Sequence, residues 1–148
     1  MISVRRAEQK DLDWLVSELQ KFATFFDSVH SMFDETHWRQ GLSGMIESHL
    51  VLVAEKEGVG LIGLIAGFVC PHPFNPKIRV LSESFWWVTE SHRQSRAGAM
   101  LLAEYMKWGE ANCQWILMAL EANSPVNEET LLKRGFRLKE RAYLKEVV

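Results

Sequence analysis

The sequence predicts a single α/β (α+β) domain spanning residues 1–148, with helices on both faces of a central sheet. Three observations lead to this prediction. The length, with 47% hydrophobic and 24% charged residues, fits one globular core. Apolar runs with strand and helix periodicity follow one another as several strands, then helix, strand, helix and strand. No repeat or Pro/Gly-rich linker divides the chain, and the loop 71–76 is too short to separate domains.

The N-terminal third predicts one strand and a pair of helices. Residues 2–6 alternate as a short strand, and a helix opens at Asp11 with acidic residues in its first turn, where the helix dipole favours them. Residues 22–38 are rich in aromatic side chains, and residues 40–49 look like the end of a second helical region. We expect this pair to pack on the sheet; alternatively, some of its aromatic residues wall a substrate pocket.

The rest of the chain predicts the remaining strands. Residues 49–55 and 61–70 read as a hairpin of central strands, and residues 80–88 as a third strand. Residues 97–110 form an amphipathic helical pattern. We then expect a strand over 115–120, a short helix over 127–134, and a closing strand that starts at Gly135-Phe136 and includes Tyr143.

Charge and cysteine content limit the partners. The net charge of -2 and the pI near 6.2 leave no overall basic excess, so we expect no nucleic-acid partner. No run is apolar and long enough for a signal sequence or membrane span, which favours a cytoplasmic protein without a membrane partner. Cys70 and Cys113 lie in apolar segments without metal-ligand spacing. We interpret them as reduced core residues, and we expect no metal site.

Residues 93–99 form the strongest candidate binding motif. A strand ends here and a helix begins, through a turn with small residues at Ser95, Ala97, Gly98 and Ala99. A helix N-terminus offers free N–H groups and a partial positive charge, which suit phosphate. Gly98 allows close approach to the backbone, and Arg93 and Arg96 add charge. The motif predicts a pyrophosphate site, although such a turn also occurs as a plain solvated connection.

The order of elements and three motifs resemble the GNAT superfamily of acyl-CoA-dependent N-acyltransferases over nearly the whole chain. The first motif is the opening strand and helix, residues 2–7 and 11–12. The second is the segment 88–102, which is similar to the family's cofactor motif Arg/Gln-x-x-Gly-x-Gly/Ala. The third is Gly135-Phe136 followed by Tyr143-Leu144-Lys145. The resemblance implies a mixed, mostly antiparallel sheet with a splayed central strand pair. It also implies acetyl-CoA, or another acyl-CoA, as co-substrate.

The resemblance assigns cofactor-binding roles by position. The pyrophosphate loop would comprise Arg93, Gln94, Ser95, Arg96, Ala97, Gly98 and Ala99, with Arg96 where the family usually has its first glycine. A backbone N–H at Trp87 or Val88 would hold the thioester carbonyl and stabilise the oxyanion. We expect Trp86 and Trp87 themselves to pack on the two faces of the sheet. Asn123 is one residue away from the position at which the family has an asparagine that contacts the cofactor arm, so the resemblance implies this role for it. The alternative is that Asn123 serves as a turn or helix-capping residue.

Glu83 is the candidate general base. An amine acceptor arrives as an ammonium ion, and a base must remove its proton directly or through water. Glu83 lies in an otherwise apolar or small-residue strand, where burial would raise its pKa. Without a bulge it shares a face with Phe85 and Trp87. The alternative is a carboxylate paired at the sheet surface. We interpret His72 and His92 as ordinary exposed histidines.

The usual acid of the family is absent. The position at which many members have a tyrosine that protonates the departing thiolate is Leu131, and neither Tyr105 nor Tyr143 matches it. The main hypothesis is therefore an N-acetyltransferase that moves an acetyl group to an unidentified amine by direct attack in a ternary complex, with water as the acid.

Two other functions remain open. One is a non-catalytic GNAT-fold protein that senses acyl-CoA or has lost it. The other, an enzyme that uses a nucleotide, is less favoured, since no Walker lysine or second glycine-rich loop follows a strand. A homodimer is compatible with the resemblance.

Overall fold

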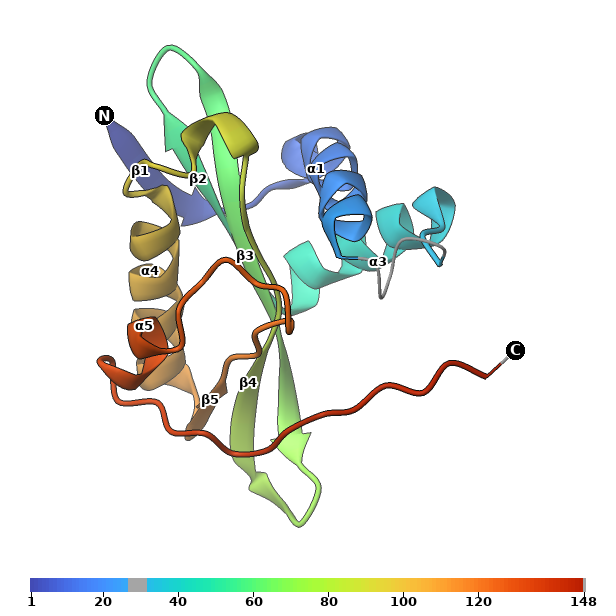
Figure 1. The fold of residues 1–148 in the computed structure, drawn as a ribbon, viewed down its shortest axis with the longest axis vertical. Helices are drawn as coiled ribbons and strands as arrows, with labels where there is room; N and C mark the ends of the chain where they lie inside the picture. Colours follow the sequence, from blue (N-terminus) through green and yellow to red (C-terminus); the bar gives the residue numbers. More distant parts are fainter. Residues whose placement is uncertain (27–31, 148) are drawn as a thin grey trace.

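The structure is a computed structural model that describes residues 1–26 and 32–147. These residues contain five strands: β1 Ile2–Arg6, β2 Leu50–Lys56, β3 Gly60–His72, β4 Asn75–Val88 and β5 Trp115–Leu117. The α-helices are α1 Leu12–Phe25, α3 Glu35–Ser48, α4 Ala97–Asn112 and α5 Glu129–Leu132 (Figure 1). The predicted first strand is confirmed, and the second helix ends at Ser48, within the region 40–49 where its end was expected.

The sheet has the order β1-β2-β3-β4-β5. The first three pairings are antiparallel, and β5 runs parallel to β4. A turn at Pro73 and Phe74 joins β3 to β4 within one long hairpin. The predicted mixed, mostly antiparallel sheet is confirmed.

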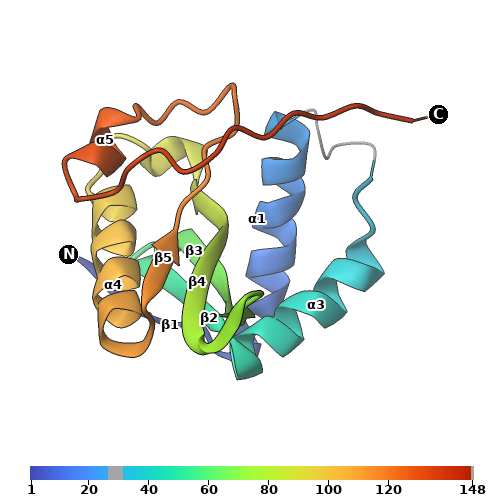
Figure 2. The same cartoon turned by 90° about the horizontal axis from the view of Figure 1, so that it is seen from below.

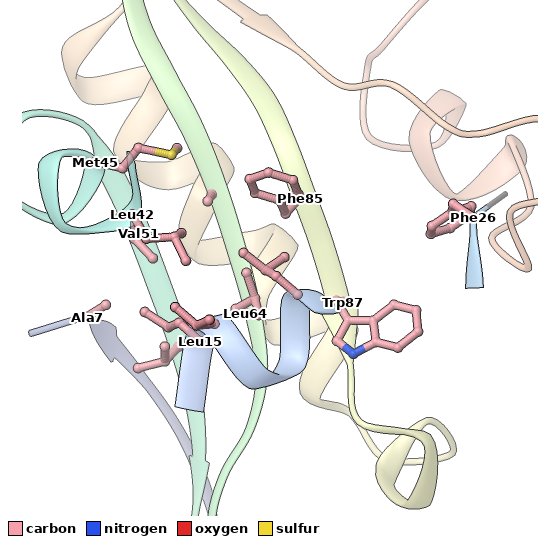
Figure 3. Close-up of a cluster of buried hydrophobic side chains, with 13 residues drawn as sticks. Ala7, Leu15, Phe26, Leu42, Met45, Val51, Leu64, Phe85 and Trp87 are labelled. Carbon is pink, nitrogen blue, oxygen red and sulfur yellow. The ribbon is translucent and has the colours of Figure 1, made fainter. Parts of the chain in front are cut away.

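Helices cover both faces of this sheet, as Figure 2 shows. On one face α1 and α3 bury a cluster that includes Leu15, Leu42 and Trp87 (Figure 3). On the other face α4 and α5 bury a second cluster that includes Leu81 and Tyr105. Trp86 and Trp87 pack on opposite faces, as the alternation of a strand requires.

A β-bulge in β4 changes which face its side chains occupy. Ala66 pairs with Phe85 and the next residue, Gly67, pairs with Glu83, so Ser84 is the extra residue. Phe85 lies in the cluster on the α1 side, whereas Leu81 lies in the cluster on the α4 side. Glu83 therefore does not share a face with Phe85 and Trp87, which the sequence predicted only for a strand without a bulge.

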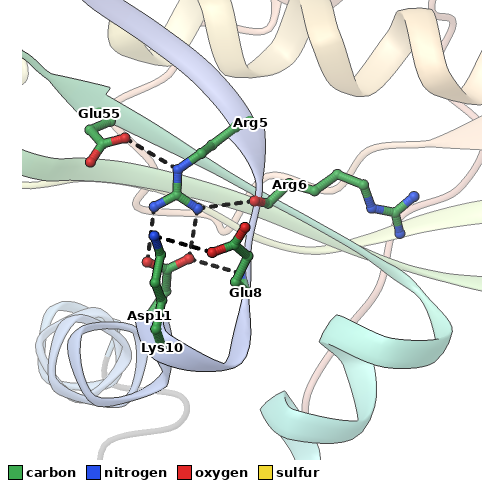
Figure 4. A network of polar contacts seen from close by, with 6 residues as sticks. All are labelled: Arg5, Arg6, Glu8, Lys10, Asp11 and Glu55. Atoms are coloured by element: carbon green, nitrogen blue, oxygen red, sulfur yellow. Dashed lines mark hydrogen bonds and ion pairs between the residues drawn. The ribbon is translucent and has the colours of Figure 1, made fainter.

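An ionic network fixes the entry into α1 (Figure 4). The Arg5 guanidinium donates to both Asp11 carboxylate oxygens, at 2.8 and 3.0 Å, and its Nε donates to Glu55 at 3.2 Å. The Arg5 hydrogen bonds hold the pKa of Asp11 below its ordinary value. Asp11 precedes the first residue of α1, where the helix dipole favours a carboxylate, and it also binds Arg5 of the first strand, so it ties α1 to β1.

Two predictions from the sequence are wrong. Residues 137–147 form no strand and are exposed, although Gly135-Phe136 does follow the last helix. Cys70 is exposed and not in the core, because it lies near the end of β3, beyond the stretch covered by helices. Cys113, in contrast, is half-buried at the end of α4 and packs against the cluster on the α4 side, and both cysteines are free. Among the described residues, no helix is long and apolar enough to cross a membrane.

Candidate functional site

The strands β4 and β5, the last two in the sheet order, separate partway along β4. Their pairing ends at Ser82 and Leu117, yet β4 continues to Val88 (Figure 1). The predicted splayed strand pair is thus present. It also explains why β5 is shorter than the predicted 115–120, because residues beyond Leu117 have left the β4 edge.

The backbone of Val88 faces the gap between these strands. The N–H of Thr89 donates to Ile62 of β3 at 2.8 Å, so Thr89 is directed toward β3. Successive residues of a strand direct their backbone groups to opposite neighbours. Trp87 therefore faces β3, like Thr89, whereas Trp86 and Val88 face the gap. Of the two candidates for a backbone contact to a ligand, Val88 has the suitable orientation.

The turn after β4 presents free N–H groups at the start of α4. The Ser95 side chain donates to the carbonyl of His92 at 2.6 Å and accepts from the N–H of Ala97 at 3.3 Å, which closes the turn. Within the described residues, the N–H groups of Gly98 and Ala99 donate to no atom. They lie in the first turn of a 16-residue helix, where the dipole favours an anion.

Gly98 packs against the end of β4. A Cβ at this position would lie 3.6 Å from Val88 and 3.9 Å from the indole nitrogen of Trp86, which are ordinary contact distances. The same indole nitrogen donates to the carbonyl of Gly98 at 3.2 Å. This bond holds the free N–H groups of α4 beside the gap-facing backbone of β4.

Arg93 turns away from the helix N-terminus. Its guanidinium lies 4.4 Å from the ring centre of Trp87 and 5.3 Å from that of Phe25, and its Nε donates to the Val88 carbonyl at 3.2 Å. Arg93 thus joins the end of β4 to α1. Gln94 and Arg96 are exposed on the turn, so Arg96 is the loop arginine with its charge in solvent.

Asn123 lies in a turn closed by a 2.9 Å bond from the Ser124 N–H to the Glu121 carbonyl. It is exposed, and no contact links it to the loop 93–99 among the described residues. The structure thus places Asn123 in a turn, and its predicted contact with the cofactor arm stays a prediction.

Glu83 lies at the point where β4 and β5 separate, one residue past the last pair. It is half-buried, and its Oε2 accepts the N–H of Ala119 at 3.2 Å across the gap. Burial raises the pKa of Glu83 to about 7, the Ala119 bond opposes this increase, and the nearby Glu121 carboxylate adds to it. A carboxylate with this pKa exchanges protons readily near neutral pH.

Tyr105 of α4 stabilises the place where β4 and β5 separate, a role that the sequence did not indicate. Its buried hydroxyl donates to the Leu117 carbonyl at 3.3 Å, in the last β4–β5 pair. It also lies 2.9 Å from the position a Cβ would take on Gly67, the residue opposite Glu83. Burial and the Glu83 charge raise the pKa of Tyr105 above its ordinary value, so it remains a neutral donor. No sequence signal reveals this, because an aromatic residue in an amphipathic helix indicates only core packing.

Leu131, at the position of the family's usual acid, and the histidines His72 and His92 have contacts of their own. Leu131 is buried in the cluster on the α4 side. His92 lies within hydrogen-bond distance of the Thr89 and Ser91 hydroxyl groups, at 3.2 and 3.0 Å. The ring of His72 packs against Trp115 at the far end of β4.

The aromatic residues of α1 and α3 form core contacts next to the site. Phe22 meets Phe85 and Trp87 edge to face, at 5.5 and 5.6 Å between ring centres, and Trp38 meets Phe85 at 5.0 Å. The expected helix pair on the sheet is confirmed. Residues 27–31, which belong to the segment expected to line a pocket, lie outside the described residues.

A cavity of about 310 Å³ lies away from this site, near the opposite end of α4. It contains none of the candidate residues; its lining residues are Arg6, Glu47, Ser48, His49, Val69, Cys70, Pro71, Arg79 and Trp108.

The sequence matches the model of the acetyltransferase (GNAT) family over residues 13–136. The chain therefore belongs to this family. Among curated proteins, none matches the sequence significantly.

Solved structures share the fold at low sequence identity. A predicted acetyltransferase with acetyl-CoA from Clostridium acetobutylicum has a TM-score of 0.75 at 16% identity, covering 99% of this chain and 96% of that one. The ribosomal-protein-alanine N-acetyltransferase of Brucella melitensis has 0.75 at 13%, covering 100% of both chains. Glucosamine-6-phosphate N-acetyltransferase of Arabidopsis thaliana has 0.75 at 12%, covering 99% and 98%.

Proposed function

We propose that this chain is an N-acetyltransferase that moves an acetyl group from acetyl-CoA to a primary amine in a ternary complex. The observation that carries the proposal is the arrangement around the β4–β5 gap. Three groups border this gap. They are the Glu83 carboxylate, whose pKa is raised to about 7, the gap-facing backbone of Val88, and the free N–H groups at the start of α4. Family membership and the acetyl-CoA named with one structural relative agree with this arrangement.

The residues present fit the cofactor. Acetyl-CoA supplies an activated acetyl thioester and a pyrophosphate. In our proposal the N–H groups of Gly98 and Ala99 bind the pyrophosphate with the help of the α4 dipole, and Arg96 adds charge from the exposed turn. The N–H of Val88 donates to the thioester carbonyl and stabilises the oxyanion. Arg93 acts indirectly, since it holds the Val88 carbonyl and the Trp87 ring.

Glu83 removes the proton of the ammonium group, directly or through one water, so that the neutral amine attacks the thioester. The Ala119 N–H orients the carboxylate, and Tyr105 holds the adjacent end of β5. Water protonates the thiolate, because Leu131 offers no proton. The acceptor is an amine; an amino sugar and a protein N-terminus are the kinds of acceptor to try first, as the names of two structural relatives indicate.

The test is release of CoA thiol from acetyl-CoA by the purified chain with a panel of amines, amino sugars and N-terminal peptides. We expect at least one acceptor to give thiol release together with acetylated product, and Glu83→Gln to abolish most of it. No release with any acceptor, while acetyl-CoA still binds, would support the alternative, a non-catalytic acyl-CoA sensor. The buried Leu131 at the position of the usual acid is the observation that favours this alternative.

A further inference from the structure

Glu18 of α1 is a buried carboxylate that the proposed mechanism does not yet use. It is 3% exposed, and among the described residues Asp11 is the other buried charged residue. Burying a carboxylate is costly unless its oxygens are hydrogen-bonded. Lys21, whose side chain is 65% exposed, donates to Oε2 at 3.1 Å, and the indole N–H of Trp87 donates to Oε1 at 3.4 Å. One oxygen therefore binds a surface lysine, and the other binds β4 inside the core.

The bond to Glu18 fixes the orientation of the Trp87 indole. This ring also packs edge to face against Phe22 and Phe25, with 5.6 Å between ring centres in both pairs. Edge-to-face packing tolerates small rotations of a ring, whereas a hydrogen bond depends strongly on direction. An apolar side chain in place of Glu18 would keep the packing and remove the directional constraint.

The face of the same indole carries Arg93. The Arg93 guanidinium lies 4.4 Å from the centre of the Trp87 ring, and its Nε donates to the Val88 carbonyl at 3.2 Å. That carbonyl belongs to the peptide group whose N–H, on Thr89, donates to Ile62 at 2.8 Å. The peptide group that follows Val88 is thus held from two sides, by β3 directly and by α1 through the indole and the guanidinium.

Printed contact by contact, the chain runs from Glu18 to Trp87, then to Arg93, and ends at Val88. Val88 is the residue whose backbone N–H faces the β4–β5 gap. A donor to an oxyanion is effective only within a narrow range of distances, so the contacts that hold the donor also affect the rate.

We propose that Glu18 is a positioning residue, which holds the oxyanion donor at Val88 in place through the two side chains between them. The inference rests on the proposed acetyltransferase function. Glu18 itself contacts neither the cofactor nor the acceptor in this account. Its effect belongs to the transition state, because the pyrophosphate is bound separately, at the N-terminus of α4.

The test compares kcat and the dissociation constant of acetyl-CoA in the wild type and in variants of Glu18. Glu18→Leu keeps the bulk of the side chain and removes the acceptor oxygen. We expect its kcat to fall about tenfold or more, since a misplacement of about 1 Å can cost about 10²-fold. Its acetyl-CoA dissociation constant should stay nearly unchanged. Glu18→Gln keeps an oxygen for the indole N–H and should retain most of the kcat.

Further variants separate the indole bond from the ion pair. Lys21→Gln removes the charged partner of the other oxygen and should leave kcat unchanged. Trp87→Phe removes the indole N–H, keeps an aromatic ring, and should lower kcat as Glu18→Leu does. Because both substitutions break one bond, Glu18→Leu/Trp87→Phe should lose no more than the larger single loss. This double variant leaves neither partner of the bond unpaired, so it tests the inference even if Glu18→Leu alone folds poorly.

Nuclear magnetic resonance of the Arg93 Nε–H follows the same contacts without turnover. In the wild type this proton should exchange slowly with solvent and show the ring-current shift of the Trp87 indole. Glu18→Leu should reduce both effects, whereas Lys21→Gln should reduce neither.

Four outcomes would overturn the inference. An active wild type with an unchanged kcat in Glu18→Leu would overturn this inference alone and leave the proposed function standing. A Glu18→Gln variant as slow as Glu18→Leu would show that the charge matters and not the hydrogen bond. A loss of acetyl-CoA affinity as large as the loss of kcat would place the effect at the cofactor site. No thiol release by the wild type would overturn the proposed function, and this inference with it.

Discussion

Glu83 combines three features of a general base in one residue. It lies where two strands separate, it accepts a backbone N–H from Ala119, and burial raises its pKa to about 7. The bulge at Ser84 places it on the α4 side, beside Tyr105 and away from the aromatic cluster on α1. Its role can therefore be tested without disturbing that cluster.

Replacing Glu83 by Gln should lower kcat by about 100-fold or more, because a positioned base contributes roughly 10²–10⁴. In the wild type, log(kcat/KM) should rise with pH up to about 7, where Glu83 becomes deprotonated, and the variant should lose this limb. A pH–rate series with one acceptor measures both effects. Glu110→Gln, exposed on α4, is the control. An unchanged pH profile in Glu83→Gln would exclude Glu83 as the base.

The same group predicts a pH-dependent stability. The pKa of Glu83 is higher in the folded protein than its ordinary 4.5, so its contribution to stability is complete below about 4.5 and decreases as the pH rises through 7. Glu83→Gln should thus be more stable than wild type at pH 8, by about 1–3 kcal/mol, and nearly equal at pH 4.5. Urea unfolding at both pH values measures this. A variant that is less stable than wild type at pH 8 would contradict it.

Arg93 and Arg96 lie three residues apart but differ in surroundings. Arg93→Ala should lower the free energy of unfolding by about 1 kcal/mol, since it removes the contact with Trp87 and the bond to Val88. Arg96→Ala should change it by less than about 0.5 kcal/mol, because Arg96 is exposed, but should weaken acetyl-CoA binding. Denaturant unfolding and calorimetric titration compare the two variants. Equal effects of the two substitutions on stability would contradict a structural role for Arg93 and a binding role for Arg96.

At the scale of elements, α4 does two things for the site. Its N-terminus presents the free N–H groups of Gly98 and Ala99, and its middle approaches the sheet closely enough for Tyr105 to reach Leu117. Gly67 permits this approach, because a Cβ there would lie 2.9 Å from both the Tyr105 hydroxyl and the Ser82 carbonyl.

Gly67→Ala should therefore destabilise the protein by about 1–3 kcal/mol, since the rigid Ser82 backbone cannot move away from the added methyl group. The matched control is Gly41→Ala within α3, where a Cβ meets no atom within 4 Å. That change should stabilise the protein by about 0.5–1 kcal/mol through helix propensity. Thermal unfolding of both variants decides this. A neutral Gly67→Ala would show that α4 and β3 are not held at this distance.

At the scale of the whole molecule, local patterns predicted the fold better than the site. The strand 2–6 and the helix starting at Ala97 were predicted because alternation and helical spacing are properties of a short segment. The closing strand failed, since the alternation of 137–147 does not reveal whether an edge of the same chain is available to it. For the site, the sequence singled out the helix N-terminus and Glu83, whose roles stay predictions. The bulge at Ser84, the direction of Arg93 and the role of Tyr105 depend on contacts between distant segments.

The central claim is that the N-terminus of α4 and the gap-facing end of β4 bind acetyl-CoA. Calorimetric titration with acetyl-CoA tests this claim most directly, with the wild type and two variants of Gly98. In Gly98→Trp the indole fills the approach to the free N–H groups. In Gly98→Ala the added Cβ fits at an ordinary contact distance, so this variant is the control. We expect saturable binding by one ligand per chain in the wild type and in Gly98→Ala, and none in a folded Gly98→Trp. No binding by the wild type, or equal binding by all three proteins, would contradict the claim.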